Sequence, residues 1–175
     1  MADIKCLLYD RAFFHELRVR ILKRPNMSQV EVRNVEKGDR TKWGELYGAY
    51  ARFYNSPQTD DMRDIVWAWL QDDAKSLFGL VATDERGEIV GIAHCREFAR
   101  PLAASTGLFL DDLFVDPKSR GSGAAEALIA HLRKLAVDNN YSIVRWVTAD
   151  NNYRARGLYD HVARKTDWLT YDIQL

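Results

Sequence analysis

The sequence has few of the residues that crosslink a small protein or bind a metal in it. Its 175 residues include only two cysteines, Cys6 and Cys95, and four histidines. No C-x-x-C pair or other metal-ligand spacing brings any of them together. We therefore expect no disulfide framework and no metal site, and a reduced, cytoplasmic protein is the simpler interpretation.

The chain also lacks an excess of charge of one sign and any long apolar run. Its 25 basic and 25 acidic residues give a formal net charge of zero, so no overall field attracts a phosphate backbone or an anionic membrane. No stretch is long and apolar enough to span a bilayer, and residues 1–26 lack the apolar block of a secretory signal. We expect neither nucleic acid nor a membrane as a partner.

What the chain does have is the composition of one ordinary domain, with 47% hydrophobic and 29% charged residues. Residues 1–26 are basic and carry Phe13, Leu17 and Ile21 at helical spacing, which leaves an amphipathic targeting helix open. Their acidic residues and their lack of serine are unlike a transit peptide. The break at Pro25-Asn26 favours an N-terminal extension ahead of a domain over residues 27–175.

Hydrophobic periodicity predicts ten elements in this domain. Strands are expected at residues 30–35, 77–82, 88–95, 108–115, 142–148 and 167–173, and helices at 40–54, 60–71, 124–137 and 152–163. The order β, α, α, β, β, β, α, β, α, β predicts an α/β (α+β) fold in which helices cover both faces of a mixed sheet. Residues 108–148 form a strand-helix-strand crossover in this interpretation.

A glycine-bearing loop lies between the strand at 108–115 and the helix at 124–137. Gly121 and Gly123 let backbone N–H groups approach a ligand at the start of the helix, and Arg120 adds a positive charge. The Walker A pattern is absent, and a dinucleotide fingerprint would need glycine or alanine where Glu126 stands. The loop therefore predicts a site for an anion of pyrophosphate size.

Arg120, Gly123 and Ala125 fit the pattern [RQ]-x-x-G-x-[GA], and in this loop the chain resembles the GNAT N-acetyltransferase superfamily. The string Asn152-x-x-Ala155-x-x-Leu158-Tyr159 matches a second signature of that superfamily. The match runs over residues 110–159, and the order of elements extends it to about 30–175. The resemblance implies a largely antiparallel sheet of six to seven strands, acetyl-CoA as co-substrate, no metal, and a possible homodimer.

The resemblance also implies which residues bind coenzyme A. They come from the strand end, the glycine loop and the second signature, and are Leu113, Phe114, Val115, Arg120, Gly121, Ser122, Gly123, Ala124, Ala125, Glu126, Asn152, Ala155 and Tyr159. Tyr159 is expected to donate a proton to the departing thiolate, for which the ordinary tyrosine pKa of about 10 is suited. A tyrosine that only packs in the core is the alternative.

Asp111 and Asp112 resemble the strand of diamine (spermidine/spermine) acetyltransferases, and residues 148–171 resemble fungal histone and polyamine acetyltransferases. Both comparisons imply a cationic amine acceptor. A primary amine with a pKa of about 10.4 must lose a proton before it attacks, and a carboxylate can hold the cation and accept that proton. Asp111 and Asp112 are therefore both candidate acceptor-binding residues. Alternation in a strand sends the two side chains to opposite faces, and the resemblance selects Asp111 as the catalytic one.

An aromatic stripe of Trp43, Tyr47, Tyr50 and Tyr54 accompanies this acidic pair. It either packs in the core or lines the acceptor pocket, where Tyr50 and Tyr54 would contact a cation. His94, His131 and His161 have no companion metal ligands and are expected to be structural or exposed, and no motif supplies a base for Cys95 as an acyl carrier.

The sequence thus predicts an acetyl-CoA-dependent N-acetyltransferase. Its acceptor is a polyamine-like or lysine-like primary amine that attacks directly in a ternary complex. Two alternatives stay open. One is a coenzyme A-binding regulator that has lost turnover, and the other is a protein or peptide lysine acetyltransferase.

Overall fold

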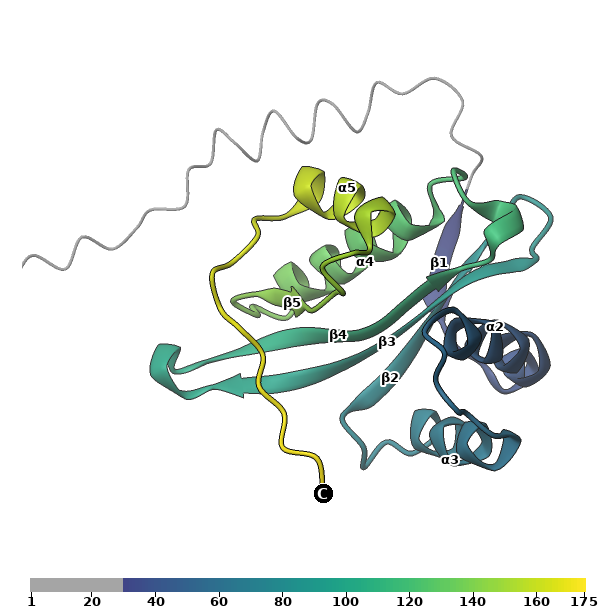
Figure 1. Cartoon of the computed structure of the whole chain (residues 1–175), viewed down its shortest axis with the longest axis horizontal. Helices are drawn as coiled ribbons and strands as arrows, with labels where there is room; N and C mark the ends of the chain where they lie inside the picture. The colour runs from purple at the N-terminus through teal and green to yellow at the C-terminus, as the bar shows by residue number, and fades with distance from the viewer. Residues whose placement is uncertain (1–29) are drawn as a thin grey trace, which may run out of the picture.

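The computed structural model describes residues 30–175, which form a five-stranded sheet and four α-helices. The proposed extension at residues 1–26 lies outside the described residues. Helices α2 (Arg40–Phe53) and α3 (Asp60–Leu70) lie on one side of the sheet, and α4 (Ala124–Asp138) and α5 (Tyr153–Val162) on the other (Figure 1). This arrangement confirms the predicted fold class of a mixed sheet between helices.

The sheet contains β1 (Glu31–Asn34), β2 (Leu77–Thr83), β3 (Ile89–Arg100), β4 (Ser105–Val115) and β5 (Val144–Trp146). Its strand order is β1-β2-β3-β4-β5, and every pair is antiparallel except β4 and β5. Parallel neighbours need a long crossover, and α4 supplies it. The predicted strand-helix-strand unit is therefore present.

The prediction of six to seven strands is wrong for the described part of the chain. Residues 167–173 form no strand, and their large side chains stand in solvent, with Trp168 84% and Tyr171 86% exposed. Their β-branched and aromatic composition gave the prediction, but a strand also needs a neighbour for its ladder of hydrogen bonds. No strand of residues 30–175 pairs with this segment.

Two apolar clusters fill the space between the helices and the sheet. On the α4 side, Leu128 and Leu132 are fully buried against strand residues that include Leu80 and Ala93. Their four-residue spacing places both on one face of the helix, and each buried leucine contributes about 1.5–3 kcal/mol. On the α2 side, Trp43 contacts the ring of Trp67 and packs in one cluster with the strand residues Ile92 and Phe114. Both faces of the sheet are therefore closed.

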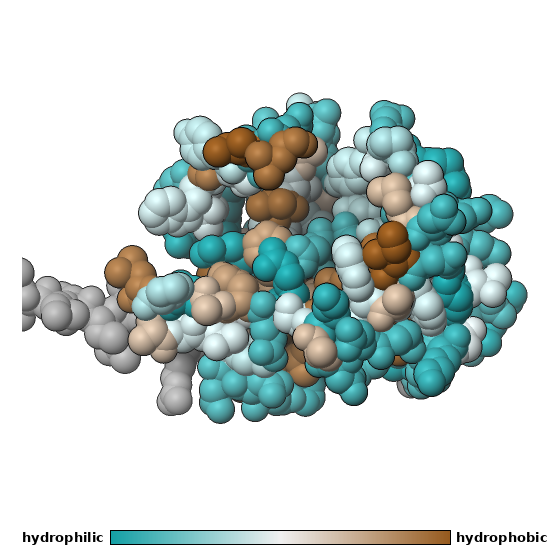
Figure 2. Space-filling view, turned by 90° about the horizontal axis from the view of Figure 1, so that it is seen from below, coloured by the Kyte–Doolittle hydropathy of each residue, from teal (hydrophilic) through white to brown (hydrophobic). Residues whose placement is uncertain are grey.

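The exposed apolar side chains include Met62, Ile65 and Trp69 on α3 and several residues of the C-terminal segment. Figure 2 shows a mainly hydrophilic face on which apolar residues form small separate groups. None of the helices within residues 30–175 has the length and apolar content to cross a membrane.

A bulge interrupts β4 at the acidic pair. His94 pairs with Asp112, whereas the next residue of β3, Cys95, pairs with Leu110, so Asp111 is an extra residue in β4. A bulge of this kind breaks the strict alternation of side chains. It decides where the two carboxylates point.

Candidate active site

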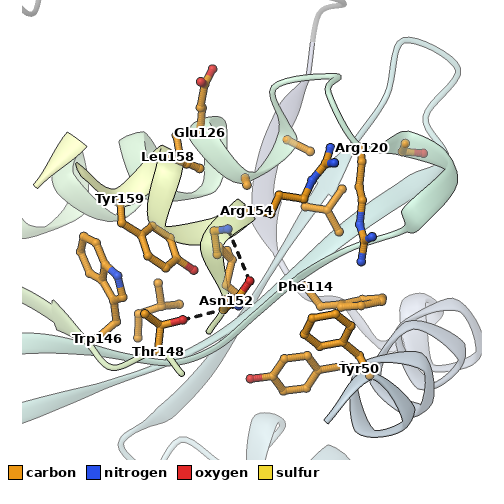
Figure 3. A pocket seen from close by; sticks show the side chains of 18 of the residues that line it. Tyr50, Phe114, Arg120, Glu126, Trp146, Thr148, Asn152, Arg154, Leu158 and Tyr159 are labelled. Atoms are coloured by element: carbon orange, nitrogen blue, oxygen red, sulfur yellow. Dashed lines mark hydrogen bonds between the residues drawn. The ribbon is translucent and has the colours of Figure 1, made fainter. Parts of the chain in front are cut away.

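The candidate site lies where β4 and β5 stop pairing. Their hydrogen-bonded register ends at Leu110 and Trp146, but β4 continues to Val115. A cavity of about 620 Å³ opens beyond this point, between the end of β4 and the start of α5 (Figure 3). One β4 edge beyond Leu110 is therefore left without a strand neighbour in the described part of the chain, so its backbone groups can bind a ligand.

The cavity brings together most of the residues predicted from the sequence. Those that line it are Tyr50, Tyr54, Asp111, Leu113, Phe114, Val115, Arg120, Gly121, Gly123, Ala124, Ala125, Glu126, Asn152, Ala155 and Tyr159. Ser122 and Asp112 are not among the lining residues. The Ser122 hydroxyl instead accepts a hydrogen bond from the Ala124 N–H at 3.4 Å.

The glycine loop leaves the start of α4 open to an anion. Gly121 and Gly123 both have positive φ, at 91° and 89°, a region that other residues enter at a cost. Gly123 is the N-cap of α4 and has no side chain to accept a hydrogen bond from the first turn. The helix dipole therefore presents partial positive charge here, and Arg120 lies beside it with its guanidinium 5.8 Å from the Phe53 ring.

Asn152 joins three elements around the cavity. It is the N-cap of α5, and its side-chain oxygen accepts a hydrogen bond from the Ala155 N–H at 3.4 Å. Its amide nitrogen donates to the Thr148 hydroxyl at 3.5 Å (Figure 3) and to the Tyr54 hydroxyl at 3.3 Å. The side chain thus fixes α5 relative to the end of β5 and to α2.

Tyr159 points its hydroxyl into the cavity from α5, and its ring packs edge-on against Trp146 at 5.2 Å (Figure 3). Burial, together with the neighbouring Tyr54, raises the pKa of Tyr159 to about 12. The ordinary tyrosine pKa expected from the sequence is therefore too low. The phenol keeps its proton throughout the physiological range and can act only as a donor or a weak acceptor.

The two carboxylates of β4 point to the same face of the sheet. His94 and Arg96 lie on either side of Cys95 in β3, so their side chains share a face of the sheet. Each of them contacts one of the two carboxylates. His94 Nδ1 lies 2.8 Å from Asp112, and Arg96 Nε donates to Asp111 at 3.2 Å. The prediction of opposite faces is wrong because the bulge turns Asp111 toward the α2 side.

Asp111 is the less satisfied of the two acids. Its Oδ1 accepts the Arg96 hydrogen bond at 3.2 Å, while the buried Oδ2 lies 3.0 Å from the same Arg96 Nε as an ion pair and accepts no hydrogen bond of good geometry from any of residues 30–175. Burial raises the pKa of Asp111 and the negative charge of Asp112 adds to this, although Arg96 opposes the shift. A half-buried carboxylate with a raised pKa is suited to accept a proton.

The sequence left open whether the aromatic stripe packs in the core or lines the acceptor pocket, and its residues do both. Trp43 is only 1% exposed and belongs to the core, whereas Tyr50 and Tyr54 line the cavity. Burial raises the pKa of Tyr47 and of Tyr50, and the negative charge of Asp112 adds to the shift in both. Their hydroxyls therefore stay protonated and lie within electrostatic reach of Asp112.

Sequence reasoning missed several lining residues, among them Phe53, Trp146, Thr148, Arg154 and Leu158. Arg154 extends from the first turn of α5 toward the Arg120 side of the cavity (Figure 3). Its position inside the second signature, two residues after Asn152, was the available signal. Residues 30–175 hold no cluster of side chains that could bind a metal, and burial raises the pKa of the Cys95 thiol, which disfavours a nucleophilic thiolate.

Comparisons with known proteins agree with this geometry. The sequence profile of the Acetyltransferase (GNAT) family matches residues 43–163. The chain is 28% identical over 144 residues to D-amino-acid N-acetyltransferase HPA3 of Saccharomyces cerevisiae, covering 82% of this chain and 89% of that protein. N-acetyltransferase 8B of Homo sapiens is 29% identical over 116 residues, or 66% of this chain and 50% of that protein.

Solved structures share the fold. The ribosomal-protein-alanine N-acetyltransferase of Brucella melitensis biovar Abortus 2308 superposes with a TM-score of 0.70 at 24% identity, covering 83% of this chain and 99% of that one. A probable acetyltransferase gives a TM-score of 0.74 at 18% identity, covering 83% and 97%. The family profile extends from α2 to the end of α5 and includes every element around the cavity. The chain belongs to the GNAT acetyltransferase family and is an N-acetyltransferase.

Proposed function

We propose that the protein transfers the acetyl group of acetyl-CoA to a primary amine by direct attack within one ternary complex. The observation that carries the proposal is the meeting of three features at one cavity. These are an uncapped helix start at Gly123, a protonated phenol at Tyr159, and a half-buried carboxylate with a raised pKa at Asp111. An acyl transfer to a cationic amine needs one of each.

The residues around the loop fit the diphosphate of coenzyme A. The N–H groups of the first turn of α4 and the Arg120 guanidinium would hold it, with Arg154 as a second cation on the same side. The free edge of β4 at Leu113 to Val115 would bind the amide groups of pantetheine. Bound there, acetyl-CoA supplies an activated acyl group to the acceptor.

The proton movements fall to two side chains on opposite sides of the cavity. Asp111 would take the proton from the ammonium group, directly or through one water, because its carboxylate lines the cavity and has a raised pKa. Tyr159 would donate its proton to the sulfur that leaves, and the second proton that the nitrogen loses as the amide forms would restore the Tyr159 phenol, while Asp111 returns its proton to solvent. No step requires a covalent acyl-enzyme, since Cys95 is buried and its thiol pKa is raised.

The acceptor is a small amine, and two classes compete. The acidic pair and the tyrosines favour a polyamine-like or lysine-like cation. The name of the yeast relative, a D-amino-acid N-acetyltransferase, suggests an amino acid. Arg96 favours this second class, because its partly exposed guanidinium adjoins Asp111 and stacks 4.7 Å from the Phe109 ring, where it could bind a carboxylate.

A thiol-release assay with acetyl-CoA separates these functions. We expect release with at least one member of a panel of polyamines, D-amino acids, L-amino acids and basic peptides. Release with D-amino acids alone would support an amino-acid acceptor whose carboxylate binds Arg96. Coenzyme A binding without release on any amine would support the regulator, and release with peptides alone would support a protein acetyltransferase. The homodimer implied by the resemblance stays a prediction that analytical ultracentrifugation would test.

Replacing Gly121 by alanine should weaken acetyl-CoA binding by about tenfold, or about 1.4 kcal/mol. The new Cβ would stand at the mouth of the anion site, and the positive φ would strain the loop by about 1–2 kcal/mol. Isothermal titration calorimetry would measure the dissociation constant.

Gly87→Ala is a matched control for this substitution. Gly87 also has positive φ, at 78°, and like Gly121 has no atom within 4 Å of an added Cβ, but it lies in the turn between β2 and β3. Both variants should lose similar thermal stability. Equal affinity of both variants for acetyl-CoA would argue against an anion site in the glycine loop.

A further inference from the structure

A hydrogen-bonded chain runs from the core to the acidic pair on the α2 side of the sheet. Trp43 Nε1 donates to His94 Nε2 at 2.8 Å, and His94 Nδ1 lies 2.8 Å from Asp112 Oδ2. The exposed fraction of the side chain rises along this chain, from a fully buried Trp43 through His94 at 2% to Asp112 at 22%. Three elements contribute one residue each: α2, β3 and β4.

The indole determines which nitrogen of His94 carries a proton. An indole N–H can only donate, so Nε2 of His94 is the acceptor, and the proton of the neutral ring stands on Nδ1 and points at Asp112. A second proton would have to enter at Nε2, where the indole hydrogen already points. The inner end of this series of hydrogen bonds is the Trp43 indole, which does not release its N–H proton. The series therefore cannot relay protons away from Asp112.

The two carboxylates therefore meet partners of different charge. Asp111 faces the Arg96 guanidinium, a cation that offsets its charge. Asp112 faces a ring that donates a hydrogen bond without adding a positive charge. The other groups that face His94 are Tyr47 of α2, edge-on at 4.7 Å, and Asp111 of β4, while Gly79 opposite it on β2 has no side chain.

We infer that Trp43 and His94 are positioning residues that hold Asp112 as an uncompensated anion, which anchors the ammonium group of the acceptor beside Asp111. This inference rests on the proposed amine acetylation. Asp112 itself does not line the cavity, but its side chain is 22% exposed, it adjoins Asp111, which does line the cavity, and its charge acts on Tyr50, which lines the cavity too. Asp112 would bind the cation, and Asp111 would accept the proton.

The test compares Trp43→Phe with Trp67→Phe in the full chain. Phenylalanine at position 43 removes the N–H donor and leaves Nε2 of His94 without the indole hydrogen that blocks a second proton. The resulting imidazolium would cancel the charge of Asp112. We expect the KM for the amine to rise about tenfold on going from pH 8 to pH 6, beyond any change in wild type. The dissociation constant of coenzyme A should stay unchanged.

Trp67→Phe is the matched control. The rings of Trp67 and Trp43 lie 5.0 Å apart in the same cluster, but the indole that donates to His94 is that of Trp43. The control variant loses similar volume and should keep the pH profile of wild type. Identical profiles for the two variants would overturn the inference.

A second pair of variants addresses His94 itself. His94→Leu should raise the KM for the amine about tenfold or more, and His94→Asn, which can still donate to Asp112, should recover most of this loss. An unchanged KM in a folded His94→Leu variant, or an equal loss of coenzyme A affinity, would overturn the inference. If wild type itself releases no thiol on any amine, the proposed function fails and the inference fails with it; wild-type turnover with insensitive variants removes only the inference.

Discussion

Replacing Tyr159 by phenylalanine is expected to lower kcat by about 10²- to 10³-fold, within the range for loss of a general acid. The dissociation constant of coenzyme A should change by less than about twofold, because the ring and its contact with Trp146 are kept. Only the hydroxyl that faces the cavity is removed. Steady-state thiol release and calorimetric titration measure the two quantities.

The raised pKa of Tyr159 adds a pH dependence to this expectation. With a pKa of about 12, the phenol stays protonated while the amine acceptor, at about 10.4, loses its own proton. The wild-type rate should therefore rise from pH 7 to about pH 10 without a falling limb from Tyr159. A falling limb near pH 9 that disappears in Tyr159→Phe would show an ordinary phenol and contradict the assigned burial effect.

Tyr153→Phe is the control for loss of a tyrosine hydroxyl. Tyr153 lies on the same helix but is 75% exposed and does not line the cavity. Its kcat should equal that of wild type. If Tyr159→Phe also keeps full turnover, the departing thiolate takes its proton from another group, such as solvent.

Most of the fold could be predicted because its elements carry local signals. The helix over α2 ends close to Asn55-Ser56-Pro57, and α4 begins directly after Gly123, as the sequence predicts. The strand at residues 167–173 was wrong for the opposite reason. Its composition suits a strand, yet strand formation depends on a neighbouring ladder, which no local pattern reveals.

In the candidate site, too, the features with a local sequence signal were predicted, and those that depend on distant residues were not. The glycine loop and the Asn152 signature are contiguous strings, and the structure brings both to one cavity. The orientation of Asp111 and Asp112 was not predictable, because a bulge depends on the register between two strands and has no residue marker here. The contact between Trp43 and His94 joins residues 51 positions apart, so no spacing rule finds it.

Asp111→Asn is expected to lower kcat at pH 7 by about 10²-fold, the usual effect of removing a general base. Asparagine has the same shape and can still accept the Arg96 hydrogen bond, so the bulge and the local packing should persist. The missing function is proton acceptance by the carboxylate, which has a raised pKa.

The pH dependence of this loss separates a base from an orienting group. Near pH 10 a large share of an amine with a pKa of about 10.4 is already neutral and needs no base, so the deficit should shrink to less than about tenfold. Asp112→Asn, its neighbour on the same face, should instead raise the KM for the amine and leave kcat closer to wild type. A deficit of Asp111→Asn that is equal at pH 7 and pH 10 would mean that Asp111 orients the acceptor and that its proton leaves by another route.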